Sequence, residues 1–359
     1  MTITNSLIAG LTDKMVQARV NSIDTSSFYF GKFFPVKRKN GFSWKMLQDQ
    51  IAQRNVAADI HTDNSSIVRK ARPRFEIASG DIPHIAISRE LTRSELKEYQ
   101  TARAFAPDSS ALQLVDHWGG DVDFCFNGVQ AELEYIAWAL LSNACKLDFT
   151  ASNNATFATQ FSLDYQVDED KKLQTSGSWA NKQHSIIDDL VKIMQSAKKL
   201  KVTPKFGFLS VEDFYQLASN EEIIKKCGSL QGALLGVNST PDLAAVNAML
   251  AKEAWLNGLQ LRVIDQTITR ELHDSVKSEN PFLQNRLVLS PTEILGETQY
   301  DILQENNPQI IRTERAHTVI KKYGQAEPTS EVTIGEADAM PVVHTAYSNL
   351  YVKTDGNSW

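Results

Sequence analysis

Residues 121–147 carry the most regular hydrophobic pattern in the chain and constrain its fold more than any other segment. The apolar positions recur in steps of four or three: Val122, Phe126, Val129, Leu133, Ile136, Leu140, Ala144 and Leu147. This spacing places them on one face of a helix. At about 1.5 Å per residue the helix would be about 40 Å long, far longer than a typical globular helix. The pattern therefore predicts a long amphipathic helix, either an ordinary core helix or a spine on which other elements are arranged.

The ends of this helix are predicted from its flanking residues. Gly119-Gly120 precede it, and Asp121 or Asp123 would serve as the N-cap. Charged residues interrupt the apolar pattern: Asp121, Asp123, Glu132, Glu134 and Lys146. These charges exclude a membrane span. We expect Gln130 and Glu134 to lie on a polar face that is available to neighbouring molecules.

Length and composition favour a folded protein of two or three compact units. The chain has 359 residues, of which 42% are hydrophobic and 22% charged, as in ordinary globular proteins. The first residues lack a signal pattern, and no apolar run reaches about 18 residues. We therefore expect a soluble product made in the cytosol. Cys125, Cys145 and Cys227 form no CxxC pair, so we expect reduced, partly buried thiols.

The net charge of −6 is unevenly distributed. Residues 1–105 hold 16 Lys and Arg against 10 Asp and Glu, a charge of +6, whereas residues 106–359 hold 21 against 33, a charge of −12. Two interpretations remain open for the basic part: an arm that contacts acidic partners, or a solvated loop with scattered charges. The acidic remainder argues against a dedicated, tight DNA-binding protein.

Residues 1–45 resemble an arm, because they show little sustained periodicity before a cluster of aromatic side chains. The cluster comprises Phe28, Tyr29, Phe30, Phe33, Phe34, Phe42 and Trp44. Such a segment is too apolar for a disordered tail and has no face for a core of its own. We expect it to pack on another copy of the protein through Phe30, Phe33, Phe34 and Arg38. The alternative is a single-stranded nucleic-acid site that combines stacking with positive charge.

Residues 46–86 are expected to form a projecting hairpin, with turns at 63–66 and 79–81. Pro73 restricts the strand at 67–79 to an edge or a projecting ribbon. Four basic residues of this strand are expected to meet acidic groups on a neighbouring subunit: Arg69, Lys70, Arg72 and Arg74. A charged amphipathic helix is predicted for residues 88–103.

The second half of the chain alternates helical and extended patterns from about Gly177 onward. Helices are predicted at 184–200, 211–219 and 240–258, and strands at 202–210, 259–272 and 285–295. This alternation predicts an α/β module of about 150 residues. Residues 331–354 have an extended pattern, and we expect them to return to the first unit.

The sequence offers no positive sign of catalysis. The seven histidines are scattered, and HExxH, GxGxxG, GxxxxGK[ST] and GxSxG are absent. Gly228, Gly232 and Gly236 are spaced four apart, but no strand or basic residue accompanies them as a phosphate site requires. We therefore predict no catalytic, cofactor or metal site.

The order of these parts resembles the lambda E-like family of tailed-phage major capsid proteins. The resemblance covers most of residues 28–350 and lies in the order and hydrophobicity of the parts. The stretches that carry it are FFPVKR (33–38), DIHTDNSSIVRKARPRFEIASGDIPHIAISREL (59–91), EYIAWALLSNACKLDFT (134–150), LQLRVIDQTI (259–268) and NRLVLSPTEILGETQYDIL (285–303).

This resemblance implies an α+β fold, the phage capsid (HK-ninety-seven-type) fold. Its implied parts are an N-terminal arm (1–45), an extended E-loop hairpin (46–86), a peripheral domain (87–176) with spine helix 121–147, an α/β axial domain (177–328) and a C-terminal strand returning to the peripheral domain (329–359). Because a folded pattern begins near residue 28, we expect any scaffold to be a separate protein.

The resemblance also implies a function without a catalytic site or cofactor. The chain would self-assemble into pentamers and hexamers of an icosahedral head that encloses double-stranded DNA non-specifically. Implied partners are other copies, a scaffold, a portal and decoration proteins, with no membrane. The protein would be made in the host cytoplasm and located in the virion. Three alternatives remain open: an encapsulin-like nanocompartment shell, an α/β enzyme with residues 184–325 as its substrate domain, and a single-stranded nucleic-acid binder.

Overall fold

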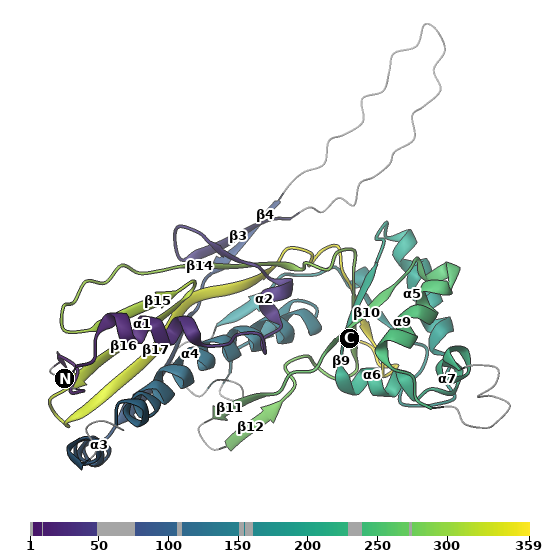
Figure 1. The fold of residues 1–359 in the computed structure, drawn as a ribbon. Coiled ribbons are helices and arrows are strands. Elements are labelled where there is room, and N and C mark those ends of the chain that lie inside the picture. Colours follow the sequence, from purple (N-terminus) through teal and green to yellow (C-terminus); the bar gives the residue numbers. More distant parts are fainter. Residues whose placement is uncertain are drawn as a thin grey trace, which may run out of the picture. The chain divides into compact units, whose positions relative to one another are not determined.

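The computed structural model describes residues 3–8, 10–48, 76–105, 110–150, 154, 161–228, 239–272 and 275–359 (Figure 1). The chain divides into two compact units, each of which combines helices with sheet. Unit 1 comprises Met1–Trp44, Asp81–Ala137 and Glu297–Val342, and unit 2 comprises Lys45–Gly80, Trp138–Gly296 and Val343–Trp359. The expected α+β class is confirmed.

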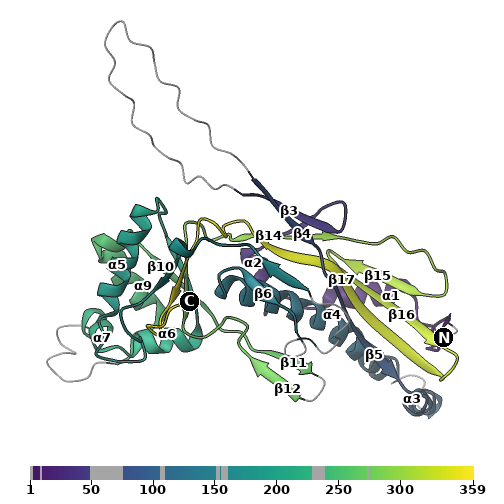
Figure 2. The same cartoon turned by 180° about the vertical axis from the view of Figure 1, so that it is seen from behind.

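Unit 1 is built on a seven-stranded sheet. Five strands follow the order β1 (Ile3–Thr4), β16 (Thr318–Gln325), β17 (Ser330–Val343), β14 (Gly296–Asp301) and β2 (Val36–Arg38). Two further strands, β15 (Ile311–Arg315) and β5 (His84–Leu91), pair antiparallel with β16 and β17 (Figure 2). Buried and half-exposed residues alternate along β17 from Glu331 to Asp338, so one face of this strand is covered and the other is partly open.

The covered face of the sheet packs against helix α4 (Ser110–Ser142). A Cβ atom on Gly335 of β17 would lie 2.5 Å from the Cys125 carbonyl oxygen, and one on Gly128 of α4 would lie 2.7 Å from Ile87. Glycine at both positions therefore permits the close approach of helix and sheet. At 33 residues, α4 confirms the prediction of a long helix with its apolar stripe on the sheet.

The predicted ends of this helix were wrong at both termini. Gly119-Gly120 lie inside α4, and Asp121 faces Arg89 of β5 at 3.6 Å instead of capping a helix. At the other end, Ala144 and Cys145 adopt left-handed φ angles, and the chain enters β6 (Lys146–Asp148). The two glycines lower the local helix propensity, and tertiary contacts stabilise the helix at these positions.

The arm contains a helix that the sequence analysis missed, α1 (Asp13–Ser22), which is capped by the Thr12 hydroxyl. Its residues Val16 and Val20 join a core cluster with Trp118 and Val122 of α4. A short helix, α2 (Phe30–Phe33), follows. Only two buried positions mark α1, and this explains why its periodicity is weak.

Helix α3 (Arg93–Phe105) begins five residues later than the predicted helix at 88–103. Residues 88–91 belong to β5, because pairing with β17 holds them extended. Thr92 and Glu95 form a capping box, in which Glu95 accepts from both the N–H and the hydroxyl of Thr92 at 2.7 Å.

Unit 2 is an α/β unit around a five-stranded sheet, as predicted. The strand order is β10 (Gln260–Ile264), β9 (Phe206–Ser210), β13 (Arg286–Ser290), β18 (Leu350–Lys353) and β8 (Lys172–Gln174). Its helices include α5 (Ile186–Lys199), α6 (Val211–Ala218), α7 (Glu221–Cys227) and α9 (Leu243–Lys252), with the 3-10 turns η1 (Glu169–Lys171) and η2 (Ala254–Leu256). Strand β6 pairs with β7 (Ser162–Asp164).

The predicted strand at 259–272 is two strands. β10 joins the sheet of unit 2, whereas β11 (Ile268–Leu272) pairs only with β12 (Ser275–Glu279) among the described residues.

The unit boundaries also differ from the expected ones. Glu297–Val342 lies in unit 1. Strands β14, β15 and β16 therefore do not belong to the α/β unit, whose predicted range was 177–328. The chain does return to unit 1 through β17, but β18 then joins the sheet of unit 2.

The projecting hairpin is described at its base, where β3 (Ser43–Gln48) pairs with β4 (Glu76–Asp81) (Figure 1). The turn predicted at 79–81 was wrong, because these residues form the end of β4. The turn predicted at 63–66 and the basic residues Arg69, Lys70, Arg72 and Arg74 lie outside the described residues.

Candidate functional site

The reactive side chains of the described residues are held in inert surroundings. Burial raises the pKa of the Cys125 thiol to about 11 and that of Cys145 to about 12, which leaves both protonated at neutral pH. Across the described ranges, His, Cys, Asp and Glu nowhere gather in a group of three or more that could hold a metal ion. Within those ranges, no helix combines the length and the apolar character needed to cross a bilayer.

One cluster in unit 2 contains the residue types of a catalytic triad, but its geometry is structural. His184 Nε2 lies 2.6 Å from Asp189 Oδ2, and the Ser176 hydroxyl donates to Asp189 Oδ1 at 2.6 Å. The serine is therefore bound to the acid, whereas a nucleophile needs the histidine as its base. Burial alone would raise the pKa of Asp189, but hydrogen bonds from Ser176 and His184 outweigh it and lower the pKa. The cluster fixes residues 176–184 onto α5.

The aromatic residues that were expected to contact another subunit lie in the interior of unit 1. Phe30, Phe33 and Phe34 are 3%, 7% and 0% exposed. The Thr298 hydroxyl donates to the Phe34 carbonyl oxygen at 3.1 Å, and the Phe30 N–H donates to Glu134 at 2.8 Å. These side chains leave almost no surface for a neighbour, so their first role is to attach the arm to its own unit.

The polar side of α4 is also buried, contrary to expectation. Glu134 is 0% exposed and Gln130 is 3% exposed. The Gln130 amide nitrogen donates to Thr318 Oγ1 at 2.8 Å and lies 3.1 Å from His317 Nε2. Both side chains therefore satisfy buried groups within unit 1 and are not available to neighbouring molecules.

His317 is buried in unit 1, with 5% of its surface exposed. Its ring packs edge-on against Phe30 and Tyr300, with centroids 6.2 and 6.1 Å away. Because the Gln130 amide nitrogen can only donate, His317 Nε2 accepts and the proton lies on Nδ1, which has no hydrogen-bond partner among the described residues. Burial lowers the pKa of His317 to about 4.

This burial predicts acid sensitivity of unit 1. Between about pH 6.5 and pH 4 the unfolded chain binds a proton at His317 that the folded chain does not, so stability is complete above this range and falls with pH. The protonation of His317 in the unfolded chain is expected to lower the free energy of unfolding by about 2 kcal/mol between about pH 7 and pH 5. Urea unfolding at both pH values would show this loss in the wild type and a smaller one in His317→Gln. An equal loss in both proteins would contradict the assignment.

Arg38, the fourth expected contact residue of the arm, lies on β2 with its side chain half exposed. Its Nε atom is 3.6 Å from Asp301 Oδ1, and the Gly41 N–H donates to Asp301 at 2.8 Å. This backbone hydrogen bond holds the pKa of Asp301 below its ordinary value. Lys37 and Lys39 both pair with Glu297, at 3.3 and 3.1 Å. Strand β2 and the residues that follow it are thus fixed to β14 by charge, while Arg38 retains an exposed surface.

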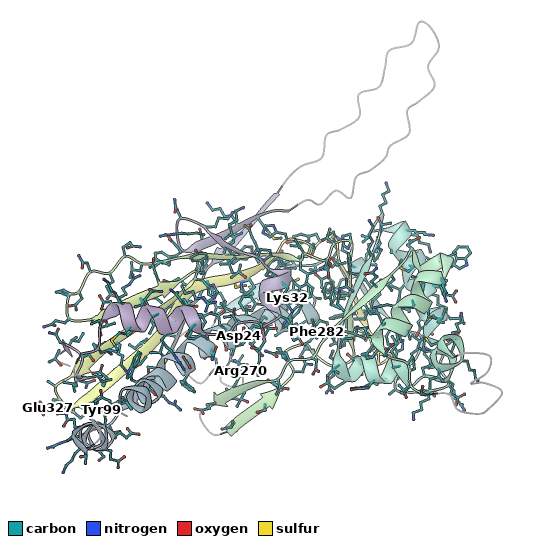
Figure 3. The ribbon with its side chains drawn as sticks, viewed as in Figure 1. Asp24, Lys32, Tyr99, Arg270, Phe282 and Glu327 are labelled. Carbon is teal, nitrogen blue, oxygen red and sulfur yellow. The ribbon has the colours of Figure 1, made fainter. Side chains whose placement is uncertain are left out.

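A second hairpin, β11–β12, was missed because residues 259–272 read as one strand. Every residue of β12 is exposed, including Val276 at 67%. Arg270 of β11, labelled in Figure 3, stands directly opposite Lys277 of β12, so two positive charges share one face of the ribbon. The signal available in the sequence was the repeated alternation on either side of residues 273–274. A two-stranded ribbon is marginal by itself, so it is a candidate contact surface.

The N-terminal segment is held by a buried carboxylate. Glu331 of β17 accepts from the Ser6 hydroxyl at 2.5 Å and from the Leu7 N–H at 2.8 Å. Lys322 of β16 lies 4.0 Å from Glu331, and both side chains are 0% exposed. A Cβ atom on Gly324 would lie 2.6 Å from the Asn5 carbonyl oxygen, so glycine is required where this segment crosses β16.

Comparison with known proteins finds similarity in structure alone. No family model matches the sequence, and no curated protein does. A phage-related protein from Bordetella bronchiseptica RB50 aligns over 96% of this chain and 98% of its own, with a TM-score of 0.54 and 11% identity. A putative capsid protein of a prophage of E. coli CFT073 aligns over 96% of this chain and 99% of its own, with a TM-score of 0.56 and 15% identity.

These two likenesses establish the fold. They span both units, and at 11% and 15% identity they concern the arrangement of the backbone. The chain has the phage capsid fold that the resemblance in the sequence implied.

Proposed function

We propose that this chain is the major capsid protein of a tailed phage or prophage. It would self-assemble into the pentamers and hexamers of an icosahedral shell around double-stranded DNA. The observation that carries the proposal is the shared fold with a putative prophage capsid protein over nearly the full length of both chains. In this assignment unit 1 is the peripheral domain, with α4 as its spine, and unit 2 is the axial domain.

The exposed surface of the isolated chain supports assembly. Large apolar side chains stand more than half exposed at Phe42, Tyr215, Val276, Ile294 and Leu303. Two of them, Phe42 and Val276, lie at the two-stranded ribbons β3–β4 and β11–β12. Subunit contacts that cover such surfaces belong to the large obligate class of interfaces. The role is structural and non-enzymatic, the location is the virion, and a separate scaffold, a portal and decoration proteins are the further partners.

Electron microscopy of the expressed protein tests this proposal. We expect closed particles of uniform size that contain or admit DNA, from the chain alone or together with its scaffold. A chain that stays monomeric under every assembly condition, including with scaffold, would overturn the proposal. Closed particles filled with an enzyme in place of DNA would instead indicate a nanocompartment shell.

Reversing the charge of the hairpin is expected to weaken the particles. We propose that Arg69, Lys70, Arg72 and Arg74 contact acidic groups on a neighbouring subunit. Changing all four to glutamate would replace attraction by repulsion, which costs several kcal/mol at each contact between charged surfaces. Particle yield and the urea concentration at which particles dissociate would both fall, while unfolding of the unassembled chain would not change. Unaltered particle stability would contradict the predicted contact.

A further inference from the structure

One corner of unit 2 combines exposed lysines with an exposed tryptophan. This lysine–tryptophan corner consists of Lys198, Lys199, Lys201, Lys252 and Trp255. Lys198 and Lys199 end α5, Lys252 ends α9, and Trp255 lies in η2, which contacts α5. All five side chains are exposed, and Trp255 is 62% exposed. The Lys198 ammonium lies 5.6 Å from the centre of the Trp255 ring.

The backbone places one of these lysines at a position where glycine is usual. Helix α5 ends in a Schellman motif, in which the Val202 N–H donates to the Ala197 carbonyl at 2.9 Å. Lys201 occupies the left-handed position of this motif, with φ of 59°. A residue with a Cβ atom costs free energy there. The backbone conformation therefore does not favour lysine at position 201, and the advantage of Lys201 lies in its charge.

Helix electrostatics account for only part of the corner. The negative end of α5 favours Lys198 and Lys199 in its last turn. The negative end of α9 favours Lys252 in the same way. Neither helix end explains the exposure of a large aromatic ring. The acidic residue nearest in sequence, Glu253, is bound to Lys226 at 2.6 Å. The corner is thus positive within residues 106–359, which carry a net charge of −12.

We propose that the lysine–tryptophan corner binds a nucleic-acid strand, with the lysines on phosphates and Trp255 stacked on a base. Exposed lysines on the elements that carry an exposed aromatic ring suit single-stranded nucleic acid. An acidic protein surface is the weaker candidate, because lysine is depleted at the centres of protein interfaces. The binding goes beyond shell formation, since contacts between subunits do not require it.

Fluorescence anisotropy of the unassembled full-length chain with labelled poly(dT) tests this site. The triple variant Lys199→Gln, Lys201→Gln and Lys252→Gln is expected to bind about tenfold more weakly at low salt. Its slope of log affinity against log salt would be smaller by about 2, because about 0.7 counterions are released for each phosphate contact. Trp255→Ala alone is expected to weaken binding by about tenfold through lost stacking.

Two matched controls separate the corner from general charge and exposure. The triple variant Lys14→Gln, Lys32→Gln and Lys97→Gln makes the same charge change at exposed positions of unit 1. Tyr215→Ala removes another exposed aromatic ring of unit 2. Both controls should bind poly(dT) as the wild type does.

Equal losses in the corner and control variants would overturn the proposal, as would unchanged binding in the corner variants. Polyglutamate competing as well as poly(dT) would also overturn it and would indicate an acidic protein partner. Particle formation is scored separately by electron microscopy, so failure of the shell proposal is distinguishable from failure of this one.

Discussion

Replacing Phe34 by alanine is expected to lower the free energy of unfolding of unit 1 by about 3–5 kcal/mol. Phe34 is 0% exposed, and its backbone carbonyl is held by Thr298 of β14. Removing the ring leaves a cavity between the arm and the sheet, because the hydrogen bond prevents the arm from moving in to fill it. Urea unfolding of the unassembled chain, followed by circular dichroism, would measure the loss.

Phe42 provides the matched control for this prediction. It belongs to the same aromatic cluster of the arm but is 52% exposed, so Phe42→Ala should change the unfolding free energy by no more than about 0.5 kcal/mol. If Phe34→Ala instead abolished particles while leaving the unfolding free energy unchanged, Phe34 would contact another subunit, as the sequence alone had indicated.

The arm shows the limit of a local sequence pattern. Such a pattern predicts that a segment is apolar, but it does not predict which surface the segment contacts. Phe30, Phe33 and Phe34 were predicted to pack on another copy of the protein, and all three are buried within the chain itself. The surface that they contact comes from β14 and α4, which lie about 100 to 260 residues further along the chain. No spacing within residues 28–44 distinguishes a contact with the same chain from a contact with another copy.

The long helix shows the same division between pattern and context. Its existence and its apolar stripe follow from a 3.6-residue period, which the sequence displays directly. Its start does not, because Gly119 lies against a neighbour from the arm. A Cβ atom on Gly119 would lie 3.3 Å from Nε of Arg19, whose side chain pairs with Asp123. The burial of Glu134 could not be predicted from the helical period either, because its carboxylate accepts a hydrogen bond from the distant Phe30 N–H.

Strand pairing decides which strands belong to which unit. The alternation of helices and strands along the sequence does not predict that pairing. β13 and β14 are neighbours in sequence. Yet β13 pairs with β9 and β18 in unit 2, whereas β14 pairs in parallel with β2 of the arm in unit 1. The lysine–tryptophan corner was not predicted for a similar reason, because its residues come from 198–201 and 252–255 and converge only in the fold.

The buried pair of Lys322 and Glu331 leads to the second large prediction. Glu331→Gln would remove the stronger of the two negative charges that act on the buried Lys322 ammonium, the other being Asp121, and burial already lowers the pKa of this lysine. Breaking a buried pair in this way costs about 3–5 kcal/mol. We expect a loss of this size in the free energy of unfolding of unit 1, measured with urea on the unassembled chain.

The double variant Lys322→Met with Glu331→Gln separates the cost of the orphaned charge from the value of the pair. Because Met has no charge to bury and Gln can still accept from Ser6 or Leu7, the double variant should recover about 2 kcal/mol or more of the loss. Ser6→Ala, which removes one neutral donor to the Glu331 carboxylate, should cost about 2 kcal/mol. The double variant could also prove as unstable as Glu331→Gln alone. In that case Glu331 would stabilise unit 1 through its hydrogen bonds to the N-terminal segment and not by neutralising Lys322.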